Sequence, residues 1–338
     1  MPHLPSPRGP LSEALIRALV RPPHAVERPG PIAGDPLAGE DLHLALYVCY
    51  ELHYRGFDGV DAGWEWEPAL LAVRRDLERH FEAGLRGALG NPSDTVEAEA
   101  MDVALRAIDA ADDAPSLSRF VERRATAEQV REFLVHRSAY QLKEADPHTW
   151  AAPRLAGAPK AALVEIQADE YGGGRADRIH SRLFADALDA LGLDNAYGAY
   201  LDHIPGVTLA TVNLMSLLGL HRRWLGGIVG HLALFEMTSS VPNRRYARGL
   251  RRLGFTDPRA TEFFDEHVTA DAVHEAIAAV DLAGGLARQD PALAPDILWG
   301  ARALVELEGR WARHVLGAWE RGESSLLAPL PEAFAAPR

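Results

Sequence analysis

Three side chains that can bind a transition metal follow one another at helical spacing near the C-terminal end of the chain. His267, Asp271 and His274 stand at positions i, i+4 and i+7 of the stretch FFDEHVTADAVHEAI. At 100° per residue these positions lie within an arc of roughly 60° on one helix face. Two imidazoles and a carboxylate on one face can bind a single ion. The neighbouring positions are apolar, so we expect this face to be buried; a solvated polar stripe or a pair of hydrogen-bonded core histidines is the alternative.

A second candidate ligand is a carboxylate in an apolar stretch, LGGIVGHLALFEMTSS. Glu236 follows Leu234 and Phe235 directly and precedes Met237. A carboxylate in such surroundings needs a partner, because a buried unpaired charge is very unfavourable. His231 lies five residues earlier, about 140° around the helix. We therefore predict Glu236 as a metal ligand and His231 as a hydrogen-bonded structural histidine.

The third set of donors flanks a triple glycine in VEIQADEYGGGRADRIHSRLFADAL. Glu170 and His180 are ten residues apart, which leaves them about 80° apart on an ideal helix. A local unwinding or π-bulge would bring them together, whereas an ordinary turn at the glycines would leave Glu170 at its rim. Asp177 precedes His180 by three residues, and it is either an alternative ligand or part of a surface pair.

Three helical stretches therefore supply carboxylates and imidazoles in equal number. The predicted ligands are Glu170, His180, Glu236, His267, Asp271 and His274. Oxygen and imidazole donors without thiolate suit iron or manganese, and zinc stays an alternative on ligand type alone. The number of carboxylates favours two metal ions, since a carboxylate can bridge two ions and a single catalytic zinc needs only three protein ligands.

The elements that position these donors are predicted to be helices. Apolar residues recur at intervals of three and four from Asp41 onward, and alternating strand patterns are nearly absent, so the predicted fold class is all-α. Nine of the 23 prolines lie in the first 36 residues, which favours a flexible arm over 1–35. We predict an N-terminal helical extension over 36–120 and a metal-binding helical domain over 121–325. Beyond residue 95, helices are expected at about 98–110, 126–145, 160–190, 193–203, 206–219, 222–240, 242–253, 256–287 and 291–320.

Composition excludes several other classes of protein. Lys and Arg total 35 against 48 Asp and Glu, and the net charge of −13 disfavours nucleic acid and anionic membranes as partners. A single cysteine, Cys49, excludes an internal disulfide framework and a cysteine-rich metal site. The N-terminal sequence has no apolar core of the kind a secretory signal requires, and no apolar run is long enough to span a membrane. We expect a cytoplasmic protein.

The motifs around these donors resemble those of the haem-oxygenase-like diiron oxidases, also called iron-containing redox enzymes. The resemblance covers roughly 125–320 and depends on Glu170 in DEYGGG, His180 in RIHSRLF, Glu236 in GHLALFEMTSS and the histidine–aspartate–histidine triplet in EHVTADAVHE. It implies a haem-oxygenase-like multi-helical bundle, preceded here by an N-terminal helical extension, in which core helices bind iron. It also implies Glu144, in YQLKEADPH, as a further ligand, although an exposed helix-end glutamate is the alternative. Asp177 occupies a place where some relatives carry glutamate.

The function that the resemblance implies is O2 activation by Fe(II), two ions per chain, without haem. The expected partner is a small amino-acid-like or amine substrate, with N-oxygenation as one outcome, and an external reductant is compatible with this function. The alternatives are a structural or iron-binding protein without catalysis, and a fatty-acid or C–C-cleaving oxidase of the same fold. A cysteine-dependent relative of the bundle is disfavoured, because Cys49 lies in an apolar helical setting. A homodimer is compatible with such a bundle, though no motif demonstrates it.

Overall fold

The computed structural model describes residues 1–330, except for the side chains of residues 269–273. Within these residues the backbone forms α-helices, short 3-10 segments and a π-helical segment, with no strand, so the predicted all-α class is confirmed. None of the described helices is long and apolar enough to cross a membrane. The α-helices are α1 (Pro10–Leu19), α2 (Glu40–Glu51), α3 (Pro68–Leu89), α4 (Met101–Ala110), α5 (Leu117–Arg123), α6 (Ala127–Gln141), α7 (Asp146–Thr149), α8 (Gly157–Glu170), α9 (His180–Ala190), α10 (Gly206–Leu220), α11 (Leu225–Arg252), α12 (Arg259–Ala276), α13 (Gly285–Gln289) and α14 (Ala294–Glu320).

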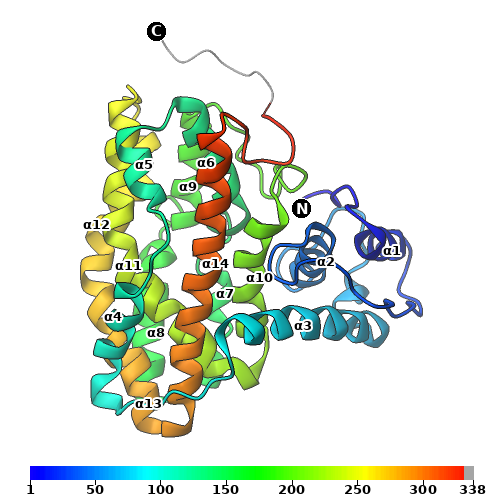
Figure 1. Cartoon of the computed structure of the whole chain (residues 1–338), viewed down its shortest axis with the longest axis horizontal. Helices are drawn as coiled ribbons and strands as arrows, with labels where there is room; N and C mark the ends of the chain where they lie inside the picture. The colour runs from blue at the N-terminus through cyan, green and yellow to red at the C-terminus, as the bar shows by residue number, and fades with distance from the viewer. Residues whose placement is uncertain (331–338) are drawn as a thin grey trace.

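The N-terminal helices α1, α2 and α3 lie together on one side of a long bundle (Figure 1). Helix α2 contacts α1, α3 and α10, and every residue from Leu42 to Glu51 is buried. A helix covered on all faces must be apolar nearly all round, which this one is. Leu15 and Leu19 of α1 are also buried, so residues 1–35 contain a packed helix. The division of the chain into three domains stays a prediction.

Helices α11 and α14 run side by side through the bundle, and α12 packs along α11 (Figure 1). Their backbones approach closely at glycines. A methyl group on Gly230 would overlap the carbonyl group of Ile297, and one on Gly300 would overlap that of Gly227. This contact fixes the position of α11 along the length of α14. It therefore also fixes where along the bundle the buried Glu236 lies.

Helix α11 is longer than the sequence predicts. A break was expected between residues 240 and 242, yet the helix continues through Pro242 to Arg252. A proline inside a helix removes one backbone hydrogen bond and bends the chain. Just before it, the hydroxyl groups of Thr238 and Ser239 donate to carbonyl oxygens within the preceding turn, a pattern that accompanies such bends. Packing against α12 and α14 stabilises one continuous helix instead of two.

Two other predicted helices differ for reasons of backbone geometry. The helix expected over 160–190 is divided into α8 and α9 by the 3-10 turn Gly172–Gly174, whose three glycines all have positive φ. The segment expected as a helix over 193–203 forms turns, and the left-handed Gly198 lies within it. Positive φ is cheap for glycine and incompatible with a continuing right-handed helix.

The helix expected over 256–287 begins at Arg259, and its backbone hydrogen-bond pattern changes from α to π after Ala276. After α12 the chain forms a π-helical segment, Ile277–Gly284, and then α13. Helices α4 and α8 pack against this segment. Its small buried residues Ala278 and Ala283 allow that close packing around the wider turn.

Candidate metal centre

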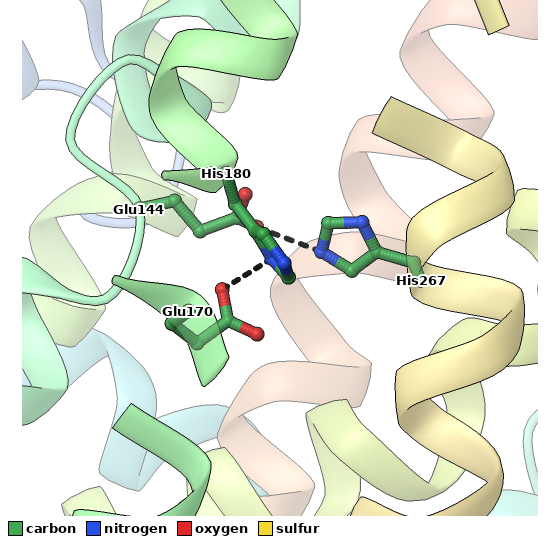
Figure 2. A group of neighbouring side chains, drawn as sticks. All are labelled: Glu144, Glu170, His180 and His267. Atoms are coloured by element: carbon green, nitrogen blue, oxygen red, sulfur yellow. Dashed lines mark ion pairs between the residues drawn. The ribbon is translucent and has the colours of Figure 1, made fainter. Parts of the chain in front are cut away.

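Four buried donors from four places in the chain converge inside the bundle. Glu144, Glu170, His180 and His267 each offer one atom to a group in which all atoms lie within 4.8 Å of one another. Glu144 follows α6, Glu170 ends α8, His180 begins α9 and His267 lies on α12. Figure 2 shows the four side chains pointing toward a common centre. Because Glu144 is only 4% exposed, the helix-end alternative of a solvent-facing glutamate is wrong.

The glycine turn between α8 and α9 brings Glu170 and His180 together. A methyl group on Gly172 would lie 2.6 Å from the carbonyl carbon of Arg178, so only glycine fits this tight return of the chain. The last residue of α8 and the first of α9 therefore face each other, with Glu170 Oε2 2.9 Å from His180 Nδ1. The turn that sequence analysis treated as the alternative to a bulge is the one present, and it buries Glu170 instead of exposing it.

Three polar atoms of this group have no hydrogen-bond partner among the described residues. They are Oε2 of Glu144, Oε2 of Glu170 and Nδ1 of His180. The last two are close, yet their orientation does not make a hydrogen bond. Leaving such atoms buried and unpaired costs about 1–3 kcal/mol each. A metal ion placed among them would satisfy all three, which is the fit expected of a ligand set.

His267 is oriented as metal-binding histidines usually are. Its Nδ1 lies 2.7 Å from the carbonyl oxygen of Phe263, and since a carbonyl oxygen only accepts, Nδ1 carries the proton. In the neutral imidazole this leaves the lone pair on Nε2, which lies 3.6 Å from Glu144 Oε1. A hydrogen bond at one ring nitrogen fixes the tautomer and direction of the other.

A second group shares one carboxylate with the first. Glu170, Glu236 and His274 are all buried and offer atoms within 4.8 Å of one another. His274 Nδ1 lies 3.2 Å from Glu236 Oε2, and its Nε2 lies 3.0 Å from Asp169 Oδ2. A cavity of about 10 Å³ lies between the groups, lined by residues of both, including Glu144 and Glu236. That is room for one small species with several polar neighbours.

Carboxylates and imidazoles stabilise one another's charges in the protein without metal. Burial lowers the pKa of His274, but the hydrogen bond and charge of Glu236, followed by Asp169, outweigh it and raise the pKa to about 9. Burial likewise opposes the charged forms of Glu170 and His180, and their mutual attraction outweighs it, lowering the pKa of Glu170 and raising that of His180. Burial dominates at Glu144 and raises its pKa. A metal ion would replace these shared protons.

The structure brings together most of the predicted ligands. Glu170, His180, Glu236, His267, His274 and the implied Glu144 all lie in the two groups. Asp271 lies on α12, but its side chain is outside the described residues. Asp177 belongs to neither group: its side chain is 74% exposed and pairs with Arg175 at 3.3 Å. His180 is buried and faces Glu170, so both pairings expected between Asp177 and His180, as ligands or as a surface pair, are wrong. His231 is buried and lies 3.1 Å from His148, as expected for a structural histidine.

Sequence analysis missed Asp169, which contacts His274 from the residue next to Glu170. Its side chain is 60% exposed, so it lies at the outer edge of the second group. Consecutive side chains on a helix point about 100° apart, which is why an acidic residue adjacent to a predicted ligand gave no usable signal.

A cavity of about 340 Å³ leads from the surface to the first group. Glu144 and His267 lie at its inner end, and its walls come from α6, α11, α12, α14 and the segment between α4 and α5. Most of the wall is apolar, and two of the lining residues, Gln141 and Trp311, each have a buried polar atom (Oε1 and Nε1) without a partner among the described residues. A concave site with a few unpaired polar groups is typical of small-molecule binding.

Comparison with known proteins agrees with this geometry. The profile of a family described as iron-containing redox enzymes, of the haem oxygenase type, matches residues 131–309, more than half of the chain. The chain therefore belongs to this family, and it is an iron-dependent oxidoreductase with a haem-oxygenase-like domain preceded by helices α1 to α5. The resemblance inferred from the motifs is confirmed.

A curated relative with a described activity is the nitrosourea synthase of Streptomyces achromogenes subsp. streptozoticus. The two sequences are 29% identical over 205 residues, which is 60% of this chain and 43% of that protein. The chain thus aligns with less than half the length of this relative.

Proposed function

We propose that this chain is a non-haem diiron oxygenase that uses O2 to oxidise the nitrogen of a small amine or amino-acid-like molecule. The observation that carries the proposal is the pair of buried donor groups that share Glu170. A carboxylate common to two groups is placed to bridge two ions.

Each group supplies donors to one iron in this proposal. Glu144, His180 and His267 would bind the first ion, Glu236 and His274 the second, and Glu170 both. Asp271 is a further predicted ligand on sequence grounds, with its side chain outside the described residues. Oxygen and imidazole donors without thiolate suit Fe(II). Bound Fe(II) would supply the electrons and the open coordination position that activate O2.

The protein's own residues bind the substrate and exclude water. The 340 Å³ cavity ends at Glu144 and His267, so a molecule bound in it would lie beside the first iron. Gln141 and Trp311 line this cavity, and each has a buried polar atom, Oε1 and Nε1 respectively, without a partner among the described residues. Arg137 and Glu308 form a doubly hydrogen-bonded pair in the same wall, at 2.9 and 2.7 Å.

Two carboxylates in the wall of the cavity support a cationic substrate over a fatty acid. Asp109 and Asp112 lie at its outer part, and burial, then the charge of Asp112, raises the pKa of Asp109. Two carboxylates near an opening attract a cationic group such as an ammonium. The name of the relative, nitrosourea synthase, points to an oxidised nitrogen in its product, and that chemistry enters here as part of the proposal.

The electron balance of the reaction requires a reductant. Converting an amine N–H to N–OH with O2 inserts one oxygen atom and reduces the other to water, which consumes two electrons and two protons beyond those of the substrate. The proposed partners are therefore the substrate, O2 and an external two-electron donor.

The test is anaerobic loading with Fe(II) followed by exposure to O2, with and without a panel of amino acids and amines. Mössbauer spectroscopy would count the irons, and an oxygen electrode would report consumption. Two irons per chain that oxidise together, with O2 uptake stimulated by a nitrogen-containing compound, support the proposal. Tightly bound iron that does not react with O2 would support the alternative of a structural or iron-binding protein. O2 uptake that only fatty acids stimulate would support the alternative of a fatty-acid oxidase.

A further inference from the structure

A buried ion pair joins the N-terminal helices to the turn that carries Glu144. Lys143 Nζ donates to Glu51 Oε2 at 3.0 Å, and the two side chains are 1% and 0% exposed. Glu51 is the last residue of α2, far from Lys143 in sequence. Neither residue belongs to the two donor groups. Lys143 is nevertheless the neighbour of Glu144 in the chain.

Aromatic side chains complete the surroundings of this pair. The hydroxyl group of Tyr197 donates to both Glu51 oxygens, at 2.8 and 2.7 Å. The ammonium group of Lys143 lies 4.2 Å from the ring centre of Tyr54 and 4.8 Å from that of Tyr47. Cation–π contacts of this kind are strongest where water is excluded. The pair is therefore oriented from several sides.

The backbone of the same turn is held from the extension as well. Arg55 donates to the carbonyl oxygen of Leu142 at 3.1 Å, and its guanidinium group lies 4.1 Å from the ring centre of Tyr197. Three residues after Leu142, Ala145 has a φ of 73°, a left-handed conformation that residues other than glycine rarely adopt. Such a conformation persists only where its surroundings enforce it.

We propose that Glu51 and Lys143 are positioning residues that hold the turn over residues 142–145 so that the Glu144 carboxylate faces His180 and His267. This inference rests on the proposed function, because it concerns the iron that Glu144 would bind. It also assigns a role to the N-terminal helices, which lie outside the residues matched by the family profile.

The buried pair of Glu51 and Lys143 selects one conformation of the turn more than it adds stability. A buried ion pair adds little net stability compared with apolar residues of similar size, because both charges lose their hydration. A buried ion pair can instead favour one backbone conformation of the segment that carries it. Here the alternative arrangement would turn Glu144 away from the donors, since Ala145 would relax to negative φ.

The test compares iron binding in two double variants. Glu51→Gln with Lys143→Met removes the ion pair, leaves no unpaired buried charge and keeps the size of both side chains. Arg8→Met with Glu40→Gln is the matched control, since Arg8 Nη1 and Glu40 Oε2 form a 2.8 Å pair at the other end of α2. Fe(II) affinity would be measured anaerobically by competition with a chelator, and the bound irons would be distinguished by Mössbauer spectroscopy.

In the variant that combines Glu51→Gln with Lys143→Met, we expect the iron beside Glu144 to bind roughly 10- to 100-fold more weakly, as on loss of residues that orient a ligand. The other iron, near Glu236 and His274, should keep its affinity and spectrum. The control should bind both irons as the unaltered chain does. Unchanged binding in a folded first variant, or equal loss in the control, would overturn the inference.

Tyr197→Phe provides a milder version of the same test if the double variant does not fold. It removes the two hydrogen bonds to Glu51 and keeps both charges, so we expect a few-fold weakening of the same iron and an altered Mössbauer signal. Wild-type affinity and spectrum in this variant would contradict the proposal. Absence of Fe(II) binding to the unaltered chain would instead refute the proposed function, and with it this inference.

Discussion

Two sets of buried histidines lie in the same bundle and have opposite properties. Burial lowers the pKa of His148 to about 4, and burial followed by the charge of His148 lowers that of His231 well below its ordinary value. His180 and His274 are equally buried, yet the carboxylates beside them raise their pKa values.

Carboxylates on adjoining helices, and not burial, therefore distinguish the candidate ligands from the other buried histidines. His148 and His231 have each other as polar partners, 3.1 Å apart; His148 lies edge-on to Tyr140, and His231 stacks on Phe235. His180 faces Glu170, and His274 faces Glu236. A histidine among apolar groups stays neutral and structural, whereas one among carboxylates lies where a cation is stabilised.

The largest contrast is expected in iron-dependent activity. His274→Ala should reduce Fe(II)-dependent O2 consumption on the order of 100-fold or more, since even the loss of a residue that only orients a ligand costs 10- to 100-fold. Helical content by circular dichroism should stay the same. His231→Gln is the matched control and should keep most of the activity. Equal activity in the two variants would remove the distinction between the two sets.

The second contrast concerns stability in acid. An unfolded chain protonates its histidines near pH 6.5, whereas folded His148 takes up a proton only near pH 4. Stability is therefore lost as the pH falls from 6.5, and by pH 5 this histidine should account for about 2 kcal/mol. His148→Gln should lose correspondingly less stability between pH 7.5 and 5, measured by urea unfolding of the metal-free protein. His3→Gln, which changes a side chain that is 89% exposed, is the control and should lose as much stability as the unaltered chain. If His148→Gln also loses as much stability as the unaltered chain, the lowered pKa assigned to His148 is contradicted.

The third contrast can be read directly from the titration of single histidines. In the metal-free protein, NMR should show His148 titrating with a pKa near 4 and His274 with a pKa near 9. Glu236→Gln should lower the pKa of His274, because it removes the charge that outweighs burial. If both His148 and His274 titrate near pH 6.5, then burial does not lower the pKa of the first and the neighbouring carboxylates do not raise that of the second.

The smallest effect is expected at Cys49, which lies in neither set. The thiol is 2% exposed, and burial raises its pKa to about 12, so it is not a nucleophile at neutral pH. Cys49→Ser should change O2 consumption by less than about twofold. A complete loss of activity in a folded, iron-loaded variant would revive the cysteine-dependent alternative.

Part of this site could be predicted from the sequence, because helical periodicity is local. The spacing of His267 and His274 places both on one face of α12 whatever surrounds them, and the apolar neighbours of Glu236 predict its burial. The same regularity predicted the fold class and most helices. It failed at Pro242, where packing maintains α11, and at residues 193–203, where glycine conformation ends helical structure.

Only the tertiary structure decided which donors meet. The 80° that separates Glu170 from His180 on an ideal helix disappears because the glycine turn reverses the chain between α8 and α9. Glu144 is buried because its turn is fixed against the N-terminal helices. Asp169 contacts His274 because α8 packs against the π-helical segment that directly follows α12. Periodicity determines the face of each helix, whereas the distance between faces depends on how close-packed helices and their turns fit together, which no single stretch of sequence contains.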